Sequence, residues 1–225
     1  MSDRPPANDA STPRCDSLRV IGVVGGIGSG KSEVARRLGE LGALVIDVDR
    51  VGHEVLEDAD VKEALCARWG PTILTSDGRI DRRLVSERVF ATEQEAQQER
   101  SFLESVVHPR IGQRLGRILE CARHQVPGPV VVLDAALLFE AGWDRYCDEI
   151  IFVDAPEDVR RRRALGRGWS VAEWRAREAA QLPLEEKRRR ATVVLVNAGT
   201  LDDLRQSVDR WWYSRRSCPT SGPPQ

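Results

Sequence analysis

The chain has 225 residues, of which 41% are hydrophobic and 31% charged, as in a globular protein with one sizeable domain or one core with an insert. Its 34 Lys and Arg residues balance 35 Asp and Glu residues, so the net charge of -1 does not indicate a nucleic-acid or anionic-membrane partner. Because there is no membrane-length apolar run, no secretion signal and no paired cysteine motif, we expect a cytoplasmic protein with reduced thiols.

Five short aliphatic runs predict the strands of a sheet. They are almost continuously apolar, which is typical of strands buried on both faces of a parallel sheet, and helices should fill the gaps as crossovers. We therefore predict an α/β fold with three layers around a five-stranded parallel sheet. The predicted strands cover residues 18–24, 43–47, 129–134, 149–154 and 192–197.

The gaps between these runs predict the domain organisation. Residues 50–128 have helical spacing throughout, which is too much chain for one crossover and indicates a helical insert. A second charged helical segment lies between Arg160 and Arg190, and both termini are rich in residues that disfavour structure. We predict unstructured tails at 1–17 and 214–225 around one domain at 18–213, with core segments 18–58, 128–160 and 190–213 and inserts at 59–127 and 161–189.

Residues 25–32, GGIGSGKS, directly follow the first predicted strand and have the form G-x-x-x-x-G-K-S. Glycines such as Gly26 let backbone N–H groups turn inward around phosphate oxygens, and the helix that begins near Lys31 adds its N-terminal dipole. The motif predicts a nucleotide site in which Lys31 reaches the β- and γ-phosphates and the Ser32 hydroxyl binds Mg²⁺. The alternative is a glycine-rich turn without function.

Three aspartates follow the second and third predicted strands. Asp47 and Asp49 are two residues apart, so both carboxylates should point to one side while the strand continues, where they could orient and deprotonate an attacking hydroxyl. The alternative is that both cap the next helix. Asp134 ends the third strand, as does the acidic residue that holds Mg²⁺ in nucleotide-hydrolysing proteins, although a simple strand-end turn would have the same pattern.

Several motifs together resemble the dephospho-CoA kinase family. In chain order they are GGIGSGKS, LGALVIDVDRVGHEV, DGRIDRRLVSERVF, LESVVHPRI, VLDAALLFE, REAAQLPLEEKRRR and VNAGT, which span residues 18–212. The phosphate loop is shared by many enzymes, whereas the combination of VIDVD, HP and LLFE is more specific. The resemblance implies a phosphate-loop kinase fold and transfer of the ATP γ-phosphate to the 3′-hydroxyl of dephospho-CoA, the last step of CoA synthesis, with Mg²⁺ required.

The resemblance also implies roles for individual residues. Asp49 would be the catalytic base, with Asp47 as its neighbour in the acceptor pocket, and residues 161–189 would form a mobile lid over ATP. Lys31 is the second predicted catalytic residue. Arg163 is our candidate for the lid cation, with Arg167 and Arg177 as alternatives. The motifs and the resemblance together give three sets of predicted site residues. The predicted ATP-binding residues are Gly26, Gly28, Ser29, Gly30, Lys31, Ser32, Glu33, Arg163 and Asn197; the predicted acceptor-binding residues are Asp47, Asp49, His108, Leu138, Phe139 and Glu140; the predicted metal ligands are Ser32 and Asp134.

Some of these roles have structural alternatives. His108 precedes a proline at what we expect to be a helix junction and could be structural. Leu138 and Phe139 could be wall or core residues, and the charge runs at 160–163 and 187–190 could be solvated helix faces. The chain could also be another small-molecule kinase or a non-catalytic ATP-binding protein. We otherwise expect ATP and dephospho-CoA as substrates, no nucleic acid or membrane, and a monomer or weak homo-oligomer.

The sequence departs from the family pattern at two informative positions. Ala136 stands where a proline usually precedes LLFE, and Glu33 replaces a usual threonine after the phosphate loop. A carboxylate in the first turn of a helix is favoured by the helix dipole. We therefore expect the Glu33 side chain to turn away from the phosphates, and the variant Glu33→Thr to bind ATP modestly more tightly.

Overall fold

The structure is a computed structural model that describes residues 18–89, 93–125 and 129–216. The predicted tail at 1–17 and residues 217–225 of the other predicted tail lie outside the described residues. The prediction of an unstructured tail from residue 214 was wrong at its start, because the last helix, α9 (Leu201–Arg216), continues through these positions. Arg215 forms an ion pair with Glu149, 3.3 Å away, and this contact tethers the last turn of α9 to the sheet.

Five parallel strands form one sheet, as the apolar runs predict. The strand order is β2-β3-β1-β4-β5, so the first strand lies in the centre. Register pairs Asp134 with both Val23 and Asp47, and the acidic strand ends therefore lie at the same edge as the end of the first strand. The strands are β1 (Arg19–Gly25), β2 (Leu44–Asp47), β3 (Val130–Asp134), β4 (Glu149–Asp154) and β5 (Val193–Val196).

Alternate residues of the central strands point to opposite faces of the sheet. Val20 and Val24 pack on one side, whereas Ile21 and Val23 pack on the other. Burial on both faces fails at the outer strands, where Leu44, Val45 and Val196 are 44%, 36% and 60% exposed. The prediction that every strand is buried on both faces was wrong for β2 and β5, because these strands form the two edges of the sheet and helices cover them incompletely.

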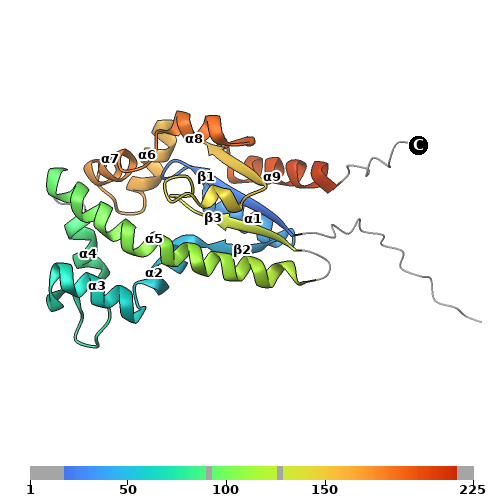
Figure 1. The fold of residues 1–225 in the computed structure, drawn as a ribbon. Coiled ribbons are helices and arrows are strands. Elements are labelled where there is room, and N and C mark those ends of the chain that lie inside the picture. The colour runs from blue at the N-terminus through green and yellow to red at the C-terminus, as the bar shows by residue number, and fades with distance from the viewer. Residues whose placement is uncertain (1–17, 90–92, 126–128, 217–225) are drawn as a thin grey trace, which may run out of the picture.

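The helices form the two outer layers. Helices α1 (Lys31–Glu40) and α9 pack on one face of the sheet, and α2 (Val48–Val55) and α5 (Glu93–Arg123) pack on the other. In Figure 1, the long green α5 runs below the sheet, and the remaining helices of the insert and lid extend beyond the carboxyl ends of the strands. These further elements are α3 (Ala59–Trp69), η1 (Pro71–Ile73), α4 (Arg82–Val89), η2 (Trp143–Tyr146), α6 (Glu157–Leu165), α7 (Val171–Ala179) and α8 (Leu184–Arg190).

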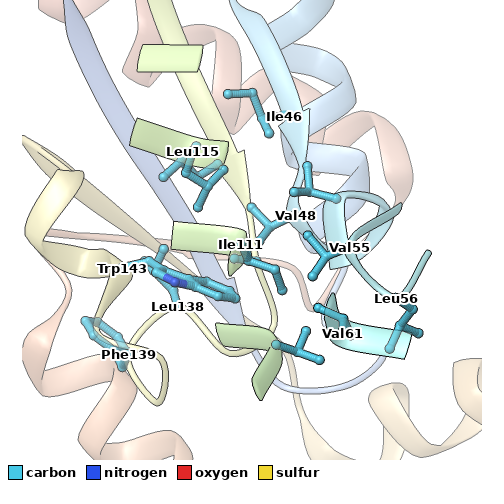
Figure 2. Packing of buried hydrophobic residues seen from close by; sticks show 14 of the residues in the cluster. Ile46, Val48, Val55, Leu56, Val61, Ile111, Leu115, Leu138, Phe139 and Trp143 are labelled. Carbon is cyan, nitrogen blue, oxygen red and sulfur yellow. The ribbon is translucent and has the colours of Figure 1, made fainter. Parts of the chain in front are cut away.

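The helical insert is not packed as a separate unit. Figure 2 shows Val61 of α3 and Ile111 of α5 in one cluster with Ile46 of β2 and Trp143 of η2. The predicted insert and lid boundaries stay predictions, and those at residues 160 and 189 fall inside α6 and α8. Among the described residues, no helix has the length and apolar character that crossing a membrane requires.

Candidate active site

A cleft of about 580 Å³ opens at the edge of the sheet where the strands end. Its lining comes from the turn after β1 with the start of α1, from α2, from the end of β3 with the segment that follows it, from α4 and α5, and from the lid segment. Of the residues predicted from the sequence, the cleft brings together Gly28, Lys31, Ser32, Asp49, His108 and Asp134.

The phosphate loop, residues 25–32, depends on glycine at defined points. Gly28 and Gly30 have φ of 81° and 103°, a region in which other residues are strained. A Cβ at Gly28 would also lie 2.5 Å from the backbone oxygen of Arg160, because α6 packs directly against the loop. Gly30 forms the N-cap of α1, so the free N–H groups of that helix begin where the loop ends. The loop therefore has the form of a phosphate cradle.

Lys31 lies between the loop and the acidic strand ends. Its Nζ donates to the carbonyl oxygens of Gly25 and Gly26, at 3.4 and 3.5 Å. Burial lowers the pKa of Lys31, whereas the charges of Asp134 and Asp49 oppose this shift. The Lys31 ammonium group is thus close to the Asp134 and Asp49 carboxylates and to the part of the loop that would bind phosphates.

Asp47 and Asp49 have different environments. Strand β2 ends at Asp47, and Asp49 lies in the first turn of α2, so the argument that both lie on one face of a strand was wrong. Asp47 caps α2 by accepting a hydrogen bond from the Arg50 N–H at 3.0 Å, as the capping alternative proposed. Asp49 faces the cleft, where burial, followed by the charges of Asp134 and Asp47, raises the pKa of its carboxyl group.

Ser32 and Asp134 lie side by side at the end of β3. Burial raises the pKa of Asp134, and a hydrogen bond with Ser32 and the charge of Lys31 counteract this. No group of three or more His, Cys, Asp or Glu residues suited to a metal occurs in the described part of the chain. Mg²⁺ in kinases needs only one or two carboxylates, because substrate phosphates and water complete its shell, so the Ser32 and Asp134 oxygens fit this ion.

Arg163 and Asn197 hold the phosphate loop from behind and do not line the cleft. Arg163 donates to the backbone oxygens of Gly28 and Ser29 at 3.2 and 3.3 Å, and to the Asn197 Oδ1 at 3.2 Å. The Asn197 Nδ2 donates to the Ser29 oxygen at 2.6 Å. The three candidate lid arginines therefore differ in position: Arg167 and Arg177 line the cleft, whereas Arg163 does not.

His108 lies in the cleft on the inner side of α5. The expected helix junction is absent: α5 continues through Pro109, and the packing of the whole helix compensates for the missing proline donor. The His108 ring packs edge-on to Trp143, with centroids 5.4 Å apart, and burial lowers the pKa of His108. Sequence reasoning missed Arg100 and Glu104, which line the cleft; their spacing of four residues from each other and from His108 on a helix was the available signal.

The LLFE segment lies mostly beneath the cleft. Leu138 is fully buried and packs over Gly22, where a Cβ would meet the Leu138 side chain at 2.6 Å. Phe139 is 5% exposed, with the Arg190 guanidinium 4.1 Å from its ring centroid, and Glu140 pairs with Lys187 at 2.9 Å. The resemblance implied that these three side chains bind the acceptor, with a wall or core position as the alternative for Leu138 and Phe139. The lining of the cleft does not include them, which favours that alternative, and a role in acceptor binding stays a prediction. Ala136 and Leu137 line the cleft in their place.

Glu33 points toward α9. Its carboxylate accepts hydrogen bonds at 3.0 Å from the Nε atoms of Arg36 and Arg205. The hydrogen bond from Arg36 is the main cause of a lowered pKa at Glu33. This side-chain direction agrees with the expectation from the sequence, and the effect of Glu33→Thr on ATP affinity stays a prediction.

Comparison with known proteins identifies similar chains over most of this length. The family model for dephospho-CoA kinase (CoaE) matches residues 19–203. The dephospho-CoA kinase of Symbiobacterium thermophilum is 39% identical over 91% of this chain and 84% of its own, and that of Geobacter sulfurreducens is 39% identical over 88% and 99%. The crystal structure of TT1252 from Thermus thermophilus has a TM-score of 0.70 and 37% identity, and covers 88% of this chain and 98% of its own.

Proposed function

The chain belongs to the dephospho-CoA kinase family, and we propose from this premise how its residues perform the family's reaction. It is an ATP-dependent kinase that transfers the γ-phosphate of ATP to a hydroxyl of dephospho-CoA, the 3′-hydroxyl of its ribose. The observation that carries the proposed mechanism is that one cleft is lined by Lys31, Asp49 and Asp134. A phosphate-binding cation, a candidate base and a candidate metal ligand therefore face the same space.

At the ATP end, the phosphate loop supplies backbone N–H donors and the N-terminus of α1. Lys31 neutralises the β- and γ-phosphates, and Arg163 and Asn197 keep the loop in its cradle shape from behind. Arg167 and Arg177 line the cleft from the lid, where they can neutralise charge that develops on the γ-phosphoryl oxygens. Of the three candidate arginines, we therefore give Arg163 the positioning role.

Mg²⁺ would be held by the Ser32 hydroxyl and the Asp134 carboxylate. When bound, the ion would supply positive charge that offsets the negative charge of the phosphates. Support for this assignment comes from the hydrogen bond between these two residues, which brings both side-chain oxygens together. A nearby cation would favour the charged carboxylate.

At the acceptor end, Asp49 orients the ribose 3′-hydroxyl and takes its proton while the hydroxyl oxygen attacks the γ-phosphorus and ADP leaves. The raised pKa of Asp49 makes its carboxylate a better proton acceptor than an ordinary aspartate. His108, with its lowered pKa, is a neutral wall of the acceptor pocket rather than a cation. Closure of the lid would exclude water, so that hydrolysis of ATP does not compete.

The test is a coupled assay of ADP release with dephospho-CoA, nucleosides and shikimate offered as acceptors. We expect release that depends on dephospho-CoA. Asp49→Asn keeps the shape but removes the base, and it should lower kcat by about a hundredfold or more. Lys31→Ala should abolish transfer while circular dichroism stays unchanged.

The matched control is Asp202→Asn on α9, whose side chain is 81% exposed. This variant should behave as wild type. Near-normal turnover of Asp49→Asn would contradict the role of Asp49, and activity that prefers another acceptor would contradict the substrate. Cytoplasmic location and a monomeric or weakly associated state stay predictions.

A further inference from the structure

Lys187 differs from the other cations of its helix. It begins the charge run of residues 187–190 on α8, which the sequence would place on a solvated face. Its side chain is 0% exposed, whereas that of Arg189 is 72% exposed. A lysine is almost never fully buried unless partners satisfy its charge, so we expect acceptors to surround the Lys187 ammonium group.

Three acceptors surround the Lys187 ammonium group. Its Nζ donates to the Ala136 backbone oxygen at 2.9 Å and to the Gln181 Oε1 at 3.0 Å, and it forms an ion pair with Glu140 at 2.9 Å. Two hydrogen bonds and one ion pair therefore compensate for the burial of this charge. The Glu140 Oε1 also accepts the Leu182 N–H at 2.8 Å, which binds the segment between α7 and α8 to the same centre.

The partners of Lys187 belong to two walls of the active-site cleft. Ala136 lies two residues after Asp134, the candidate metal ligand, and Gln181 lies where the lid helix α7 ends; both line the cleft. The Lys187 charge also contributes to the lowered pKa of Lys31. Lys187 therefore connects the base of the lid to the loop after β3, next to the phosphate site.

We propose that Lys187 is a positioning residue for phosphoryl transfer, which fixes the base of the lid and the loop after Asp134 in one arrangement by binding Gln181, Ala136 and Glu140. It does not contact substrate. The proposal rests on the kinase function and assigns a role in the reaction to a residue that does not line the cleft. Because displacement of reacting groups by about 1 Å can cost a hundredfold in rate, loss of this connection should act on the chemical step.

Stability and positioning can be separated because the pair is buried. Removal of Lys187 alone leaves the Glu140 carboxylate buried without its cation, which destabilises the fold. Replacement of both partners by apolar side chains of similar volume removes that penalty. The double variant Lys187→Met/Glu140→Leu should therefore recover part of the stability, since the Leu182 N–H still loses its Glu140 acceptor, without recovering the connection between the lid and the loop.

The experiment measures melting temperature, kcat and the KM values of both substrates for Lys187→Met, the double variant and Arg189→Met. We expect kcat to fall about tenfold or more in both Lys187 variants. The melting temperature should fall in the single variant and recover in part in the double variant. Arg189→Met removes a cation that pairs only along α8 with Glu186, as far as the described contacts show, and should leave all values unchanged.

A folded Lys187 variant with wild-type kcat and KM would overturn the proposal. If neither Lys187 variant folds, the variant Gln181→Met tests the proposal instead. It removes only the Gln181 acceptor of Lys187 at the base of the lid. This variant leaves one donor of the buried Lys187 ammonium group without its acceptor, so its melting temperature should fall less than that of Lys187→Met. It should lose about threefold or more in kcat, and an unchanged kcat would count against the proposal. The wild-type enzyme in the same assay tests the kinase function itself. Failure of the proposed function is therefore distinguishable from failure of the role proposed for Lys187.

Discussion

At the scale of single residues, the proposed chemistry depends on carboxylates that disturb each other's ionisation. Asp49 lies near Asp134 and Asp47, and both charges add to the effect of burial in raising its pKa. Lys31 acts in the opposite direction. Because only the deprotonated carboxylate can accept the hydroxyl proton, the proposed base should set the acid limit of activity.

Asp47→Asn tests this coupling. The Asn side chain can still cap α2 for the Arg50 N–H, so the helix should stay intact. Loss of the Asp47 charge lowers the pKa of Asp49, so the pH at which kcat/KM falls in acid should move downward. The measurement is a pH profile of kcat/KM, with Asp202→Asn as the control that should not move it. An acid limb that stays in place or moves upward would contradict the coupling.

At the scale of elements, the phosphate loop keeps its shape because other segments pack behind it. Helix α6 contributes Arg163, and the turn after β5 contributes Asn197, which is 4% exposed. Both bind backbone oxygens of the loop, so the orientation of its N–H groups depends on residues far away in the sequence. The loop motif alone therefore does not create the phosphate site.

Asn197→Ala should weaken both stability and ATP binding. The substitution removes two hydrogen bonds, the one that Asn197 donates to the Ser29 oxygen and the one that it accepts from Arg163, and leaves the Ser29 oxygen, among the described contacts, with only the 3.3 Å contact from Arg163. The expected cost is about 1–3 kcal/mol. A loss of that size lowers the melting temperature of a chain of this length by roughly 2–12 °C. The KM for ATP should rise more than the KM for dephospho-CoA. Gln206→Ala on the exposed side of α9 is the control, and equal effects on both KM values would contradict the role of Asn197.

At the scale of the whole molecule, the insert and the sheet share one hydrophobic cluster. Residues of α3 and α5 such as Leu65 and Leu115 belong to the same buried set as Val131 of β3 and Phe152 of β4. Figure 2 shows this continuity for Leu115 and Ile111 next to Ile46. Packing is therefore continuous from the acceptor side of the cleft to the centre of the sheet.

The shared core predicts one cooperative unfolding transition in differential scanning calorimetry, with equal calorimetric and van't Hoff enthalpies. Leu65→Ala, in the insert, should destabilise the whole molecule by about 2–5 kcal/mol, because Leu65 is 0% exposed. The single transition should shift as a unit. Two separate transitions, with only one affected by Leu65→Ala, would show that the insert unfolds independently.

Much of the fold and part of the site could be predicted from local sequence. The five apolar runs and the helical spacing between them identified the strands and their parallel arrangement, because these patterns reflect burial in neighbouring segments of chain. The spacing of GGIGSGKS placed Lys31 and Ser32 correctly in the cleft, because a strand, a tight loop and a helix N-terminus follow one another directly.

Other assignments depended on contacts that the local pattern does not contain. The exposure of β2 and β5 followed from their places at the edges of the sheet, and the separate environments of Asp47 and Asp49 followed from where β2 ends. Leu138 and Phe139 lie in the core because the chain turns them toward Gly22 and Arg190.

The sequence by itself determined the family, the sheet and the phosphate-binding motif of this protein, because each depends on consecutive or regularly spaced residues. Only the tertiary structure decided which cations face the cleft. Arg163 turns to the back of the loop, Arg167 lines the cleft, and Lys187 is buried between the lid and the loop after β3. The physical reason is that a charged side chain takes the place where distant acceptors satisfy it, and those acceptors come together only when the chain folds.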